Sequence, residues 1–181
     1  MNRKKFLQAT GSISGLLFLP QFAKSQVIRQ QATQLNKQQD PDPYKIETVK
    51  EFVVAGHGGK DGDLDKVKSL LHDYPNIVHA TFDWGNGDFE SAIDGAGHMG
   101  NKEIANYLID AGSRVSLFVL TMLGKTELVK PILEVYPKLI FANGPHGLTM
   151  LHHAKKGGKD GEELYNYLLG KGLDKTWVKI K

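Results

Sequence analysis

The stretch NGPHGLTMLHHAKKGGKDGEELYNYLLGKG, residues 143–172, decides the fold of this chain. Within it, Thr149 precedes a short apolar run, and a second apolar run ends at Gly172. A threonine hydroxyl can accept hydrogen bonds from the first amides of a helix, and glycine commonly follows the last residue of one. The stretch therefore predicts two short helices joined by a glycine-rich turn.

Segments elsewhere in the chain repeat parts of this stretch or of one another. The matching pairs are 104–112 with 164–172, 67–80 with 129–142, and 58–62 with 157–161. The last pair is offset by 99 residues, which is three periods of ~33. These three independent internal similarities indicate a chain built from similar units.

The segment Thr149-Met-Leu-His-His-Ala154 resembles the T-P-L-H-x-A signature of ankyrin repeats, with Met150 in place of the proline. The residues AGSRV at 111–115 resemble the A-G-A-D-V closure of the same repeat. The resemblance implies an all-α fold, an ankyrin-repeat solenoid of about four helix-turn-helix units, over residues 44–174. Because one unit cannot bury its own apolar face, the units are expected to stack.

Local signals place the ends of individual helices. Asp63 and Ser91 are suited to cap helices, and Gly100 is expected to turn the chain within the second unit. Pro131 lacks an amide donor and predicts a kink or a late start in the second helix of the third unit. No β-strand pattern competes with the helices. The C-terminal tail, residues 175–181, is expected to cover the open face of the last unit.

The first 43 residues predict an export signal and a tether. Residues 1–25 begin with a basic run, continue with a short, weakly apolar run, and end in small residues suited to cleavage. The basic run resembles a twin-arginine signal with Lys4 in place of the second arginine, so the twin-arginine and general secretory routes both stay open. Residues 26–43 are polar and glutamine-rich and predict a linker. We expect a bacterial protein exported to the periplasm or beyond, without stable membrane insertion after cleavage.

Composition excludes several classes of site. The chain has no cysteine, which rules out disulfides, thiolate nucleophiles and cysteine-based zinc sites. The formal charge of +3 arises in the export signal: residues 1–25 hold four basic residues and no acidic one, which leaves 19 basic and 20 acidic residues in the body. A nearly neutral body argues against nucleic-acid binding through a basic surface.

The connection between the first two units, residues 81–90, is the main candidate for partner binding. It contains three aromatic residues and two glycines, and ankyrin proteins present a projecting finger at this place. Exposed aromatic residues commonly anchor interfaces; the alternative is that Phe82 and Phe89 pack into the core. The residues expected to contact a protein partner are Phe82, Trp84, Asn86, Asp88 and Phe89 on the finger, with His57, His98 and Met122 on the concave helix face.

Two histidines at equivalent places in their units form a second candidate site. His57 and His98 each follow an Ala-Gly pair, and adjacent helices lie ~8–10 Å apart, so their imidazoles can approach each other. Metal binding, with Asp94 or His153 as a further ligand, is an alternative hypothesis. No close-spaced ligand pair such as H-E-x-x-H supports it, so no metal and no other cofactor is assigned.

Four further residues need an explanation. Thr149 and His152 belong to the repeat signature, and their expected roles are structural: a helix cap, and hydrogen bonds to nearby backbone groups. Gly95 and Gly97 lie inside an expected helix, where each costs roughly 1 kcal/mol relative to alanine. Close helix packing explains Gly97. It does not explain Gly95, for which room for a ligand is the other interpretation.

The sequence has no nucleophile-and-base motif and no phosphate-binding loop that follows a strand. The resemblance therefore implies a non-catalytic monomer that recognises a protein partner through its finger loops and concave helix face. The alternative is a metal-binding protein, or an enzyme, that uses a His/Asp cluster in the groove.

Overall fold

The computed structural model describes residues 42–59 and 63–180. The expected export signal and most of the expected linker lie outside these residues, as does part of the first glycine-rich turn. The fold described below belongs to the compact unit Tyr44–Lys181. No helix within the described ranges has the length and apolar character needed to cross a bilayer.

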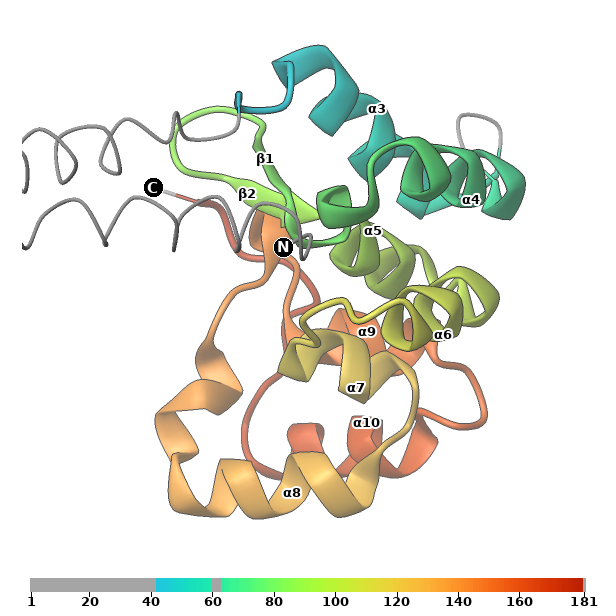
Figure 1. The fold of residues 1–181 in the computed structure, drawn as a ribbon. Helices are drawn as coiled ribbons and strands as arrows, with labels where there is room; N and C mark the ends of the chain where they lie inside the picture. The colour runs from blue at the N-terminus through green and yellow to red at the C-terminus, as the bar shows by residue number, and fades with distance from the viewer. Residues whose placement is uncertain (1–41, 60–62, 181) are drawn as a thin grey trace, which may run out of the picture. The chain divides into compact units, whose positions relative to one another are not determined.

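The described residues form eight α-helices arranged as four consecutive pairs (Figure 1). The pairs are α3 (Ile46–His57) with α4 (Leu64–Asp73), α5 (Ala92–Met99) with α6 (Lys102–Asp110), α7 (Leu117–Met122) with α8 (Thr126–Val135), and α9 (Met150–Lys156) with α10 (Glu162–Gly170). The predicted helical character and the two helices of the 143–172 stretch are therefore confirmed.

Short 3-10 helices follow α4, follow α8 and precede α9. They are η2 (Pro75–His79), η3 (Pro137–Phe141) and η4 (Pro145–Gly147). The first two occupy the same place in the echoing segments 67–80 and 129–142, so the sequence similarity there reflects a shared local structure. Each begins at a proline, whose fixed φ suits the first position of a helix.

The prediction that no strand forms was wrong in one place. Strands β1 (Thr81–Asp83) and β2 (Phe89–Ser91) pair antiparallel, with Phe82 opposite Glu90. Between them, Gly85, Asn86 and Gly87 all adopt positive φ angles, which lets the chain reverse sharply. The finger expected at residues 81–90 is thus a β-hairpin, and alternate side chains of its strands face opposite sides.

Side-chain caps fix the starts of four helices. Asp63, Ser91, Asn101 and Ser116 each accept a hydrogen bond from the backbone N–H three residues later, and such caps are typically worth about 1 kcal/mol each. The predicted caps Asp63 and Ser91 are confirmed. Thr149 does not cap α9, because its hydroxyl instead donates to the carbonyl of Lys175 at 2.6 Å.

The first helices of the pairs pack in chain order: α3 on α5, α5 on α7, and α7 on α9. In addition, α9 reaches past the short helix α7 and contacts α5. A Cβ atom at Gly100 would lie only 2.8 Å from the carbonyl oxygen of Lys156, so glycine permits this close approach. Met122, expected on a concave surface, is fully buried instead, because neighbouring helices cover α7.

Two apolar clusters hold the pairs together. Phe52, Ile93 and Leu108 lie in the first, and Leu133 and Leu164 lie in the second.

Helix α8 continues through Pro131 and begins at Thr126, so the predicted late start of this helix was wrong.

The C-terminal tail pairs with residues at the start of the last helix pair. It runs beside the loop that precedes α9, and Leu148 and Trp177 form an isolated antiparallel bridge.

Candidate metal centre

Glu90 lies at the centre of the strongest polar cluster in the described residues. It is 0% exposed, because residue 90 of strand β2 faces the helices, whereas its neighbour Phe89 faces outward and is 58% exposed. Burying a carboxylate is costly unless nearby groups hydrogen-bond it or balance its charge. Within residues 42–59 and 63–180, no lysine or arginine pairs with Glu90; the groups around it there are three imidazoles and one indole.

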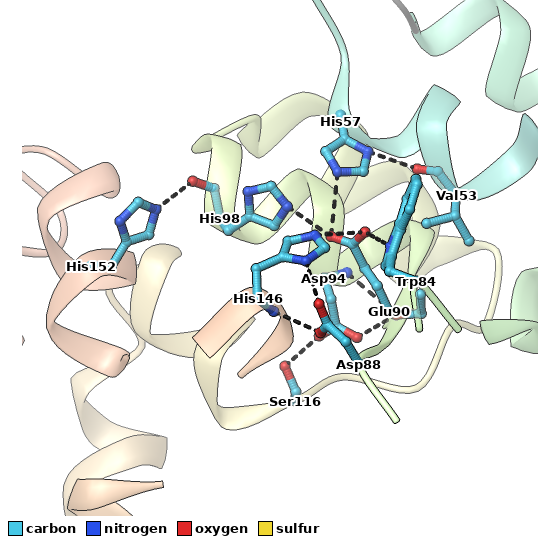
Figure 2. Close-up of polar contacts among 11 residues, drawn as sticks. Val53, His57, Trp84, Asp88, Glu90, Asp94, His98, Ser116, His146 and His152 are labelled. Atoms are coloured by element: carbon cyan, nitrogen blue, oxygen red, sulfur yellow. Dashed lines mark hydrogen bonds and ion pairs between the residues drawn. The ribbon is translucent and has the colours of Figure 1, made fainter. Parts of the chain in front are cut away.

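Both oxygens of Glu90 are surrounded by nitrogen atoms (Figure 2). Oε1 lies 2.7 Å from Nε2 of His98 and 3.3 Å from Nε2 of His57. Oε2 accepts a hydrogen bond from Nε1 of Trp84 at 2.7 Å and lies 3.3 Å from Nε2 of His146. Glu90, His57, His98 and His146 together present four potential ligand atoms that all lie within 4.8 Å of one another.

Distant parts of the chain supply these side chains. His57 is the last residue of α3, His98 lies near the end of α5, Glu90 lies on β2, and His146 lies in η4. The rings of His57 and His98 stand edge to face with centroids 4.8 Å apart. The prediction that these two imidazoles approach each other is confirmed.

Gly95 provides the space that His57 needs. A Cβ atom at Gly95 would lie 3.1 Å from Nδ1 of His57 and 3.2 Å from its Cε1, so any side chain at this position would require the imidazole of His57 to shift. Gly97 instead faces helix α7, where a Cβ atom would lie 3.0 Å from Cγ2 of Val119. Packing thus explains Gly97, as predicted, and the imidazole of His57 explains Gly95.

The hydrogen-bond partners of the Nδ1 atoms show where the proton lies on the imidazoles of His57 and His146. Nδ1 of His57 lies 3.0 Å from the carbonyl oxygen of Val53, and Nδ1 of His146 lies 2.7 Å from Oδ2 of Asp88. Both partners can only accept hydrogen bonds, so each Nδ1 carries a proton. In a neutral ring, Nε2 would then direct a lone pair at the carboxylate of Glu90. A positive charge at each Nε2, either a proton or a shared metal ion, removes this conflict.

The charges in the cluster favour an ionised Glu90. Burial alone would raise the pKa of Glu90, but hydrogen bonds from His57 and His98, and the charge of these rings, hold that pKa well below its ordinary value. The hydrogen bond with Glu90 raises the pKa of His57, against the opposing effect of burial. Glu90 is therefore a carboxylate at neutral pH, the form that binds cations.

His146 is held in an uncommon backbone conformation. Its φ is 59°, in the left-handed region that non-glycine residues rarely adopt. Asp88 fixes it from the hairpin: Oδ1 accepts the backbone N–H of His146 at 2.8 Å, while Oδ2 accepts from the ring. Strained conformations of this kind concentrate at functional sites, and here the conformation places the imidazole against Glu90.

The other metal ligands considered from the sequence do not join the cluster. Asp94 accepts hydrogen bonds from the hydroxyls of Ser91 and Ser116. His153 is fully buried, and its Nδ1 donates to the carbonyl of Thr149 at 2.8 Å. The hypothesis of a metal site around His57 and His98 therefore needs different further ligands, namely Glu90 and His146.

The residues expected to bind a partner fall into two groups. Trp84 and Asp88 face the cluster and support it, and Phe82 stacks edge to face on Trp84 with centroids 4.9 Å apart. Phe89 points away from the cluster and is well exposed, and Asn86 lies in the turn of the hairpin. His152 has the structural role expected of it, since its Nε2 contacts the carbonyl oxygen of His98 at 2.9 Å.

Glu90 and His146 were missed as site residues for a physical reason. Glu90 falls within the finger predicted at residues 81–90, and nothing in the local sequence around Glu90 or His146 marks either residue as a ligand. One signal was present: residues 81–90 and 143–147 follow the two echoing segments 67–80 and 129–142. Both loops follow a 3-10 helix, and in the structure Asp88 of the first loop contacts His146 of the second.

Comparison with known proteins gives no match: no family model, no curated protein and no solved structure matches this chain. The chemistry of the cluster itself must therefore indicate its use. Three imidazole nitrogens and one ionised carboxylate, partly open to solvent at His57 and His146, form a donor set typical of transition-metal sites.

Proposed function

We propose that this protein binds one divalent transition-metal ion through Nε2 of His57, His98 and His146 and the carboxylate of Glu90. One observation carries the proposal: three imidazole Nε2 atoms surround a fully buried carboxylate, and hydrogen-bond acceptors at Nδ1 orient two of the three imidazoles. A carbonyl or carboxylate on the far nitrogen is the usual partner of a metal-binding imidazole.

The ligand types narrow the class of metal. Imidazole suits Zn²⁺, Cu²⁺, Fe²⁺ and Ni²⁺, whereas Mg²⁺ and Ca²⁺ prefer oxygen ligands alone. Ligands bound at about 2.0–2.2 Å lie nearer to one another than the 4.8 Å spread of this cluster. Loading with metal would therefore draw the four side chains slightly inward, with Glu90 as the shared neighbour of all three rings.

A purely protonic cluster is the competing explanation. In it, His57 and His146 would both carry a positive charge around one carboxylate, and no metal would bind. A metal ion achieves the same charge balance while leaving each ring neutral, the form that ligates metals. The two explanations differ in one measurable property, the metal content of the purified protein.

Metal analysis of the full chain tests the proposal. The wild-type protein is incubated with Zn²⁺, dialysed and assayed by elemental analysis, beside His98→Ala and the matched control His72→Ala. His72 is a surface histidine whose side chain is 88% exposed. We expect about one Zn²⁺ per chain for the wild type and for His72→Ala, with loss of binding for His98→Ala. Equal metal content in all three proteins, or none in any, would refute the proposal.

For the scaffold, we propose a stack of the ankyrin type that is exported from a bacterial cell. The support is the signature at 149–154, the four helix pairs and the order in which the first helices pack. If the twin-arginine route is used, the protein crosses the membrane folded, and a bound metal would cross with it.

Protein recognition remains a second proposed function, supported by the exposed outer face of the hairpin. Phe89 lies there, 58% exposed, one residue from the buried Glu90. Crosslinking in the native cell envelope would compare wild type with Phe89→Ala. Loss of a specific crosslinked protein in the variant supports this role, and an unchanged pattern contradicts it. The proposal does not require catalysis.

A further inference from the structure

The C-terminal segment 175–180 is fastened to the loop that carries His146. The backbone N–H of Thr149 donates to the carbonyl of Thr176 at 3.1 Å, and the N–H of Val178 donates to the carbonyl of Gly147 at 2.9 Å. Gly147 allows this pairing: its φ is +73°, and a Cβ atom there would lie 2.0 Å from the carbonyl oxygen of Val178. In Figure 1 the red C-terminal segment runs beside the orange loop before α9.

One contact in this segment reaches the proposed metal ligand itself. The indole Nε1 of Trp177 donates to the backbone carbonyl of His146 at 2.7 Å. Trp177 is 54% exposed, so burial of its ring is incomplete and the directed hydrogen bond is its most specific interaction. Together, Trp177 and Asp88 hold both backbone polar groups of His146.

The four proposed ligands are not equally anchored. His57 and His98 lie on helices that pack directly against each other, and Glu90 lies on the strand joined to α5. His146 lies in a short loop and reaches the cluster only because that loop is held in place. Withdrawal of His146 would leave three protein ligands and an open position, an arrangement that favours exchange of the metal or binding of another ligand.

We propose that residues 175–180 act as a strap that positions His146 and so controls how fast the bound metal is released. Trp177 is a positioning residue in this device. The inference rests on the proposed metal site, which it deepens by assigning the control of exchange to one segment. Loss of outer contacts to metal ligands typically weakens binding 10–100-fold, and the strap makes such a contact with the backbone of the ligand residue.

The test is the rate at which Zn²⁺ passes from the loaded full-length protein to an excess of a chromophoric chelator. Trp177→Phe keeps an aromatic ring and removes the N–H donor, and Lys179→Ala serves as a control on the same segment. We expect Trp177→Phe to release Zn²⁺ roughly 10–100-fold faster than the wild type, and Lys179→Ala to release it at the wild-type rate. Melting of the metal-free proteins reports any general loss of stability.

A double-mutant comparison separates positioning from a merely structural role. If the strap acts through His146, Trp177→Phe should have no further effect on release in a His146→Ala background. An equal acceleration in both backgrounds, or an unchanged rate in Trp177→Phe alone, would overturn the strap while leaving the metal site intact. A wild-type protein that takes up no Zn²⁺ would overturn the metal site and the strap with it.

Discussion

The buried His153 predicts a specific loss of stability in acid. Its side chain is fully buried on α9, and its Nε2 has no hydrogen-bond partner among the residues that the structure describes. Burial lowers the pKa of His153 to about 4, against the opposing effect of its hydrogen bond to Thr149. In the unfolded chain the same group would titrate near the ordinary histidine value of about 6.5. The native state therefore holds a neutral ring that the unfolded state protonates more readily.

The sign and size of the effect follow from linkage. Because the unfolded state binds the proton at higher pH, His153 lowers the free energy of unfolding progressively as the pH falls from about 6.5 toward 4. A difference of about 2.5 pKa units at 1.36 kcal/mol each gives a loss on the order of 3 kcal/mol once the pH is below both values. Well above pH 6.5 the His153 ring is neutral in both states, so its titration no longer changes the free energy of unfolding.

Urea unfolding measures this loss in wild type and His153→Leu at a series of pH values, from about one unit above the unfolded-state pKa of histidine down to the native pKa of about 4. Leucine is apolar and of similar size, and the Thr149 carbonyl keeps the backbone N–H of residue 153 as a donor. A chelator in both samples removes any contribution from bound metal, and the difference between the proteins cancels other titrating groups. We expect the variant to gain stability relative to wild type as the pH falls. Parallel curves of unfolding free energy against pH for the two proteins would show that His153 does not cause the loss of stability in acid.

Two further predictions concern the groups that support the cluster. Asp88→Asn weakens the hydrogen-bond acceptor at Nδ1 of His146, so the Zn²⁺ affinity, measured by competition with a chelator, should fall roughly 10–100-fold. The control Asp83→Asn, on the same hairpin, should keep the wild-type affinity. Equal affinities in all three proteins would contradict the assigned role of Asp88. Gly95→Ala places a methyl group 3.1 Å from Nδ1 of His57, so it should weaken Zn²⁺ binding while changing the melting temperature of the metal-free protein little. A lower melting temperature with unchanged Zn²⁺ affinity would show that Gly95 serves packing alone.

The local architecture was predictable because local signals specify it. Capping residues such as Ser91 and the glycine turns set the helix ends, and the repeated segments set the pairing of helices. The approach of His57 to His98 followed from their equivalent positions. Strands β1 and β2 were not predicted, since three-residue strands depend on each other and on the intervening turn rather than on a pattern in the sequence.

The composition of the cluster was less predictable because it depends on loops. Glu90 faces inward only once the hairpin register pairs it with Phe82. His146 reaches Glu90 only in a left-handed conformation held by Asp88 and Trp177, residues 58 positions before it and 31 positions after it. Gly95 did indicate the site from the sequence. A glycine inside a helix is destabilising, helix packing did not explain it, and in the structure it leaves space for the imidazole of His57.

The most direct test of the proposed metal site is diffraction from crystals of the zinc-loaded full chain, recorded at the zinc absorption edge. We expect one strong anomalous peak enclosed by His57, Glu90, His98 and His146, with ligand distances of about 2.0–2.2 Å. A peak located elsewhere, or a cluster that retains its hydrogen bonds with no peak at all, would contradict the proposed site.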